Sequence, residues 1–191
     1  MDPYILDIIN KMNKLRNAKT TSYGISGMCE RVMLCDVSSS MTGGKFDGMK
    51  KALEMNVTEN DGIIAFGDDV YNVPYHAINK MELSFGLTSM LPAIKEAIEK
   101  MRPSKVIMMT DGDPNKGGSQ RDVIDYISGL CGVVIDCIGI SDDSHEWDDF
   151  DPEFLKTLCD ITGGTYQHVS DPRKLGGAIK LLSCETKAIN L

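Results

Sequence analysis

The sequence predicts an α/β fold, with a doubly wound, mostly parallel sheet flanked by helices on both faces and an extra N-terminal helix. First, short apolar runs alternate with helical patterns of about ten residues, which is typical of βαβ units. Second, the runs 32–35, 106–109 and 133–138 contain few polar residues, as strands buried on both faces do. Third, 191 residues can form one such domain with a full core, and no linker divides them.

The first expected element is a helix near the N-terminus. Asp2 and Pro3 suit its first turn, since aspartate accepts from free N–H groups and proline has no N–H to lose. An apolar stripe then runs through Ile5, Ile9, Met12 and Leu15. We assign residues 1–30 to this helix and the loop after it, and residues 31–191 to the α/β domain.

The remaining elements are expected within residues 31–191. The predicted strands and short apolar runs lie at 31–35, 62–66, 70–73, 105–109, 132–138 and 165–169. The predicted helices lie at 46–55, 89–101, 121–130, 152–160 and 172–182.

Composition narrows the possible partners and location. A formal net charge of -8 argues against nucleic acid, because binding a phosphate backbone requires clustered Lys and Arg. No apolar run approaches the roughly 20 residues of a membrane span, and residues 1–15 do not resemble a secretion signal. The six cysteines form no C-x-x-C pair and mostly lie in apolar segments, which favours reduced thiols in a cytoplasmic protein.

Polar side chains follow two of the predicted strands. Asp36, Ser38 and Ser40 come after the run 32–35, and Asp111 comes after the run 106–109. Thr88 lies in a loop just before the predicted helix 89–101. In open parallel sheets ligands bind beyond the carboxyl ends of the strands, so these groups are expected at one edge. Their oxygens suit Mg²⁺ or Mn²⁺, whereas the lack of nearby His and Cys argues against zinc and copper.

The same residues resemble the metal-ion-dependent adhesion site of von Willebrand factor type A domains. The resemblance rests on the D-x-S-x-S pattern of residues 36–40, on Thr88 before a helix and on the T-D-G of residues 110–112. It extends roughly over residues 31–184: "IIAFGDDV" resembles the family's second strand and turn, and "LCDITGGTYQHVSDPRKLGGAI" its last helix, strand and helix.

The resemblance implies a role for each site residue. Ser38, Ser40 and Thr88 would bind Mg²⁺, or Mn²⁺, through their hydroxyls. Asp36 and Asp111 would act through bound water or by hydrogen-bonding the serines. A Glu or Asp of a partner protein would complete the coordination. The implied protein is a stand-alone, non-enzymatic protein-binding module, an adaptor or assembly factor, with neither nucleic acid nor membrane as partner.

Three further readings are weighed against this one. A haloacid-dehalogenase-type, Mg²⁺-dependent phosphohydrolase would use Asp36, but that family's pattern resembles D-x-D and Ser38 stands at the second aspartate. A metal-free scaffold would instead dock a partner on the N-terminal apolar stripe. A phosphate loop at 43–45 is excluded because the pattern needs a glycine at 39 and a hydroxyl at 46.

The acidic segment 141–151 is expected at the same edge of the sheet as the metal site.

Overall fold

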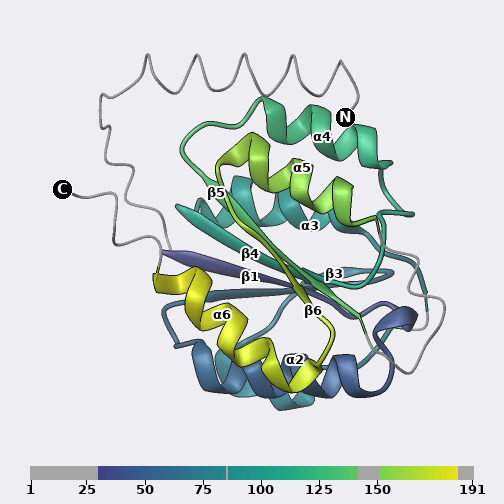
Figure 1. Ribbon diagram of the computed structural model, residues 1–191, viewed down its shortest axis with the longest axis vertical. Helices are drawn as coiled ribbons and strands as arrows, with labels where there is room; N and C mark the ends of the chain where they lie inside the picture. The colour runs from purple at the N-terminus through teal and green to yellow at the C-terminus, as the bar shows by residue number, and fades with distance from the viewer. Residues whose placement is uncertain (1–29, 85, 142–150, 185–191) are drawn as a thin grey trace.

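The protein is described by a computed structural model that covers residues 30–84, 86–141 and 151–184 (Figure 1). Within these ranges one sheet has the strand order β3-β2-β1-β4-β5-β6. Its strands are β1 (Arg31–Asp36), β2 (Gly62–Phe66), β3 (Val70–Asn72), β4 (Lys105–Thr110), β5 (Val134–Ile140) and β6 (Tyr166–Val169). Only the β2–β3 pair is antiparallel. The predicted mostly parallel α/β sheet is therefore confirmed. The predicted N-terminal helix lies outside the described residues.

Helices cover both faces of the sheet, as predicted (Figure 1). They are α2 (Gly44–Asn56), α3 (Met90–Glu96), α4 (Gln120–Ser128), α5 (Pro152–Thr162) and α6 (Leu175–Cys184). Shorter helical turns are η1 (Ser39–Met41), η2 (Tyr75–Lys80), η3 (Ala97–Met101) and η4 (Pro172–Lys174). In Figure 1, α2 and α6 lie below the sheet, and α3, α4 and α5 lie above it. None of the helices in the described ranges has the length and apolar character needed to cross a bilayer.

Two apolar clusters form the core, one on each face of the sheet. Successive residues of β1 alternate between them: Met33 and Cys35 pack in the cluster with α2 and α6, whereas Val32 and Leu34 pack in the cluster with α3 to α5. Because both faces are covered, every position of a central strand gains from an apolar side chain. This explains why the central strands read as mostly apolar runs rather than as alternating ones.

Local sequence signals set several helix ends. Ser119 and Asp122 form a reciprocal capping box at the start of α4. The Asp151 side chain accepts from two backbone N–H groups at the start of α5, whose first residue is Pro152. Gly163 ends the same helix with φ 75°, a left-handed conformation that favours glycine.

Two predicted helices are interrupted in the structure. The helix expected over 89–101 consists of α3 and the π-helical turn η3, in which the Arg102 N–H donates to the Ala97 carbonyl at 3.1 Å. The helix expected over 172–182 starts as the turn η4 and continues as α6. Both regions are helical, but the apolar periodicity does not distinguish an α-turn from a tighter or wider one.

The sheet order places the carboxyl ends of β1 and β4 side by side. From β1 the chain moves to β2 on one side, and it later returns to β4 on the other side of β1. The space between β1 and β4 is therefore the point where the connections diverge, which is where open α/β sheets bind ligands. The parallel register pairs Cys35 with Met109, so Asp36 and Thr110 are the next residues along their strands.

Candidate metal-binding site

The five predicted site residues come from three segments at this edge of the sheet. Asp36 is the last residue of β1, and Ser38 and Ser40 lie in the loop and turn that follow. Asp111 follows β4, and Thr88 precedes α3. All but Ser40 are buried.

The two serine hydroxyls form the centre of the site. The Oγ atoms of Ser38 and Ser40 are 3.0 Å apart, and the Ser40 hydroxyl donates to Asp111 Oδ1 at 2.7 Å. Neighbouring oxygen ligands of an octahedral ion with bonds near 2.1 Å are about 3 Å apart. The serine pair therefore already has the separation that two adjacent ligands of Mg²⁺ would need.

Thr88 borders the same space as Ser40. An ideal Cβ placed on Gly112 would lie 3.7 Å from Ser40 Oγ and 3.9 Å from Thr88 Oγ1. The Thr88 backbone is fixed by its N–H, which donates to Asn115 Oδ1 at 2.6 Å. The lack of a side chain at Gly112 thus leaves space beside the two hydroxyls.

Asp36 holds the serine loop in place through hydrogen bonds. Its Oδ1 accepts the backbone N–H of Ser38 at 2.8 Å, and its Oδ2 accepts the Thr110 hydroxyl at 2.5 Å. Complete burial raises the pKa of Asp36 to about 6, although the hydrogen bonds from Ser38 and Thr110 act in the opposite direction. Both oxygens of this carboxylate therefore have partners within the protein, and the carboxylate holds the loop that carries the serines.

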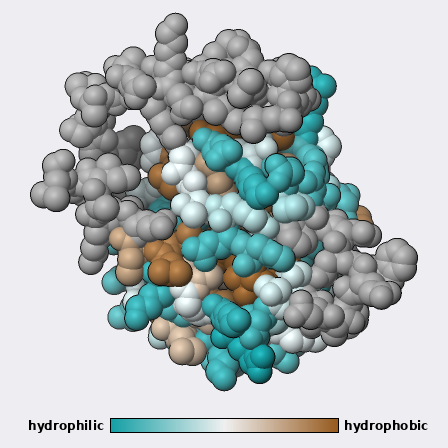
Figure 2. All heavy atoms as spheres, in the orientation of Figure 1, coloured by the Kyte–Doolittle hydropathy of each residue, from teal (hydrophilic) through white to brown (hydrophobic). Residues whose placement is uncertain are grey.

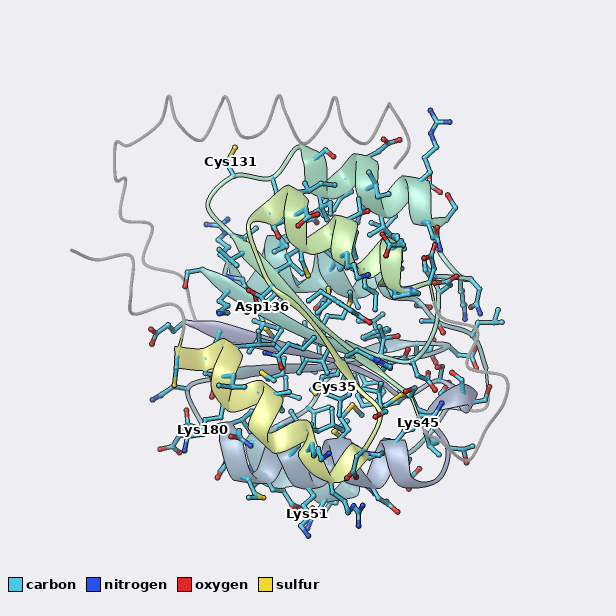
Figure 3. The ribbon with its side chains drawn as sticks, in the orientation of Figure 1. Cys35, Lys45, Lys51, Cys131, Asp136 and Lys180 are labelled. Carbon is cyan, nitrogen blue, oxygen red and sulfur yellow. The ribbon has the colours of Figure 1, made fainter. Side chains whose placement is uncertain are left out.

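Asp111 is shared between the serine loop and helix α2. Its Oδ1 accepts from Ser40, and its Oδ2 accepts from Lys45 Nζ at 2.8 Å. The Lys45 and Asp111 side chains are 4% and 0% exposed, so this is a buried ion pair. Figure 3 shows Lys45 at the end of α2 that adjoins the serine loop.

Sequence reasoning missed three residues of this network. Lys45 was considered only as part of a phosphate loop, and no local pattern indicates that it reaches Asp111. Thr110 belongs to the T-D-G pattern, so its place beside Asp36 could have been inferred from parallel pairing of the two strands. Asn115 has no signal in the sequence that connects it to Thr88.

The donor set fits a hard divalent cation. Ser38, Ser40 and Thr88 offer neutral hydroxyls. The two carboxylates accept hydrogen bonds from the serines: Asp36 from the Ser38 N–H and Asp111 from the Ser40 hydroxyl. In the part of the chain that the structure describes, no group of three or more His, Cys, Asp or Glu side chains is placed to hold a metal ion. Hydroxyl and carboxylate oxygens are ligands that Mg²⁺ and Mn²⁺ prefer, so the donor types at this site suit either ion.

The two described histidines lie on other elements of the fold. His76 is exposed in η2, and His168 Nε2 lies 2.8 Å from the Ser141 hydroxyl at the end of β5. The rest of the acidic segment, residues 142–150, lies outside the described residues, as does His145.

Comparison with known proteins agrees with this fold. Residues 74–168 match the family model of the von Willebrand factor type A domain. The match includes Thr88 and Asp111 but begins after the serine loop. The match supports a likeness to this family over that part of the chain, and members of the family often mediate protein–protein interaction. None of the curated proteins that were compared matches the chain.

Several solved structures share the fold at low sequence identity. A von Willebrand factor type A protein from Catenulispora acidiphila aligns with a TM-score of 0.68 and 19% identity, over 84% of this chain and 43% of its own. BatB from Bacteroides thetaiotaomicron aligns with a TM-score of 0.64 and 15% identity, over 83% of this chain and 98% of its own. Proximal thread matrix protein 1 of the mussel byssus aligns with a TM-score of 0.63 and 19% identity, over 82% of this chain and 45% of its own. The chain thus spans less than half the length of the Catenulispora protein.

Proposed function

We propose that this chain is a protein-binding domain whose binding depends on a divalent cation at Ser38, Ser40 and Thr88. Asp36 and Asp111 position the serines, and a Glu or Asp of a partner protein supplies the remaining ligand. Mg²⁺ is the proposed cation, and Mn²⁺ suits the same donors. When bound, the cation supplies a positive charge that attracts the partner's carboxylate.

The observation that carries this proposal is the chain of short contacts from Ser38 through Ser40 to Asp111. It brings two hydroxyls to the separation of adjacent ligands, and it does so at the carboxyl ends of β1 and β4. Three neutral hydroxyls neutralise little of a divalent charge. An anionic ligand from outside is therefore favoured over a neutral one.

The position of Asp36 favours binding over phosphate chemistry. A phosphohydrolase of the haloacid-dehalogenase type would need this carboxylate to attack a phosphorus atom. In the structure the side chain is 0% exposed, and each of its oxygens accepts a hydrogen bond. These contacts support a structural role for Asp36, and we propose that the domain is not an enzyme.

The proposal extends to the setting in which the domain works. The five described cysteines are free thiols, and three of them are buried. Reduced thiols are typical of intracellular proteins, so we propose a cytoplasmic adaptor or assembly factor.

A pull-down from native lysate tests the proposed function. Wild-type protein is used as bait in Mg²⁺ and in EDTA, beside Ser38→Ala and Ser39→Ala in Mg²⁺. Ser39 is the matched control, because it is exposed and its hydroxyl donates to the Gly86 carbonyl at 3.4 Å, away from the serine pair. Capture by wild type and Ser39→Ala in Mg²⁺, and by neither EDTA-treated protein nor Ser38→Ala, is expected.

Equal capture in all arms would contradict the metal-dependent interaction. A parallel assay with a generic phosphate ester separates the two classes of function. Turnover that requires Mg²⁺ and disappears in Asp36→Asn would replace the binding proposal with the phosphohydrolase.

A further inference from the structure

A groove of about 1150 Å³ runs between α2 and the segment formed by η4 and α6. In Figure 1 this is the lower face of the molecule, opposite to α3, α4 and α5. The groove begins at Gly44, directly after the serine loop, and continues past Met55 to the last turn of α6. It is thus a surface distinct from the metal site but adjacent to it.

Glycines form much of the groove. A Cβ on Gly48 would lie 2.7 Å from Pro172 Cβ, so only glycine allows α2 to approach η4 this closely. A Cβ on Gly177 would meet nothing within 4 Å, so this part of α6 is open. Met55 lies along the groove and is 72% exposed, so it offers an apolar contact beside the charged residues of the lining. Figure 2 shows hydrophilic and hydrophobic residues side by side on this lower part of the molecule.

The groove carries an excess of positive charge. Its two carboxylates already face cations: Asp171 pairs with Arg173 at 2.8 Å, and Asp47 lies 3.4 Å from Lys50. The lining also contains Lys51 of α2, Lys174 of η4 and Lys180 of α6. None of the three forms an ion pair within 4.0 Å with a described residue, although Lys174 is close enough to Asp171 to help lower the pKa of that carboxyl. Figure 3 shows Lys51 and Lys180 on the two helices that border the groove.

This local charge is opposite to that of the whole chain, which has a formal net charge of -8. A long polyanion such as nucleic acid would be repelled by the rest of the surface. A short acidic segment can instead place its carboxylates near the lysines without extending over the acidic surface.

We infer that this groove binds an acidic polypeptide segment of a partner protein, with its carboxylates at Lys51, Lys174 and Lys180. An apolar residue of the segment contacts Met55. The interaction needs no metal ion, so it does not depend on the proposed function of the serine site. A partner that used both surfaces would gain affinity from two linked contacts.

A direct binding assay with a synthetic probe tests this inference. The probe is a fluorescent peptide rich in glutamate with a central leucine, and the matched probe has glutamine in place of every glutamate. All titrations contain EDTA, so that a carboxylate cannot bind through a divalent cation. Binding of the glutamate probe that weakens as salt is added, and no binding of the glutamine probe, is expected.

Charge reversal locates the binding surface. The variant Lys51→Glu/Lys180→Glu should bind the glutamate probe about tenfold more weakly or worse, because attraction becomes repulsion at two points. The control Lys80→Glu/Lys100→Glu makes the same charge change at exposed lysines outside the groove and should bind as wild type does. Amide NMR signals of Gly48, Gly176 and Gly177 should shift when the probe is added to wild type.

Four results would overturn the inference: equal binding of the two probes, equal loss in the two double variants, unchanged glycine signals, or binding only when Mg²⁺ replaces EDTA. Tighter binding to anionic lipid vesicles or to an oligonucleotide than to the glutamate probe would also overturn it. That outcome would assign the lysines to a different class of partner.

Discussion

Lys45 Nζ lies 2.8 Å from Asp111 Oδ2, and the two side chains form a buried ion pair between helix α2 and the residue that follows β4. The other oxygen of Asp111 accepts the Ser40 hydroxyl at 2.7 Å. One carboxylate therefore joins the helix, the strand and the serine loop. Because Lys45 already supplies a positive charge, the site is less negative than its two carboxylates alone would make it.

Removing Lys45 should destabilise the metal-free protein. In Lys45→Met, Asp111 becomes a buried carboxylate without its cation, which typically costs about 3 kcal/mol or more in the free energy of unfolding. Mg²⁺ should restore part of this loss, because a bound cation supplies the missing charge. Urea unfolding in EDTA and in Mg²⁺ measures both effects. Lys50→Met, which removes a partly exposed lysine of the same helix, is the control.

The Lys45 prediction has a clear negative outcome. If Lys45→Met and wild type unfold at the same urea concentration in EDTA, the ion pair contributes nothing to stability. If Mg²⁺ stabilises the variant no more than it stabilises wild type, Asp111 is not coupled to the cation.

Substitution of the hydroxyl ligands should weaken metal binding without unfolding the protein. Even residues that only support metal ligands typically contribute 10–100-fold to affinity, so Ser38→Ala and Thr88→Ala should each lose about tenfold or more. Titration with Mn²⁺, followed by electron paramagnetic resonance, measures the affinity. Ser39→Ala is expected to bind as wild type does, since its hydroxyl points to the Gly86 carbonyl. Unchanged affinity in Thr88→Ala would remove Thr88 from the ligand set.

A second buried ion pair should stabilise the opposite end of the sheet. Lys105 Nζ lies 2.7 Å from Asp136 Oδ2 and also donates to the Leu182 carbonyl of α6, while Asp136 Oδ1 accepts the Thr165 N–H at 2.8 Å. Asp136→Ala leaves the lysine buried without its carboxylate, so the free energy of unfolding should fall by about 3 to 5 kcal/mol.

The matching double variant separates charge from packing. Lys105→Met/Asp136→Leu removes both charges and keeps side-chain volume, so it should be less destabilised than Asp136→Ala. Chemical denaturation of the three proteins provides the comparison. A double variant that is less stable than the single one would mean that the hydrogen bonds to Thr165 and Leu182, rather than the ion pair, dominate.

Two glycines should respond in opposite directions to the same substitution. A Cβ on Gly164 would lie 2.0 Å from the Ile135 carbonyl oxygen, so Gly164→Ala forces the backbone apart and should cost about 3 kcal/mol. A Cβ on Gly177 meets nothing within 4 Å, and alanine is about 0.5–1 kcal/mol better than glycine within a helix. Thermal unfolding should show a lower Tm for Gly164→Ala and a higher one for Gly177→Ala. Equal shifts in the two variants would contradict this account.

The fold class could be predicted because its signals are local. Strands β1, β4 and β5 are mostly apolar since helices cover both of their faces, and the helix patterns between them indicate the parallel topology. The exact bounds of the helices could not be predicted as well as the fold class. Apolar periodicity could not show that the helix after Thr88 changes to a π-helical turn at Ala97, or that the last helix begins as a short turn at Pro172.

The sequence alone determined which polar residues stand at the ends of strands, because each follows its own apolar run. Asp36, Ser38, Ser40 and Asp111 could therefore be listed without a structure, and Thr88 was added by its place before a helix. Only the tertiary structure decided how they are held. Lys45 and Asp111 are 66 residues apart and Thr110 and Asp36 are 74 apart, and these pairs meet only through strand register and helix packing. Parallel pairing of β1 with β4 would suggest the contact between Thr110 and Asp36. The contact between Lys45 and Asp111 depends on how α2 packs against the sheet, which no local pattern shows.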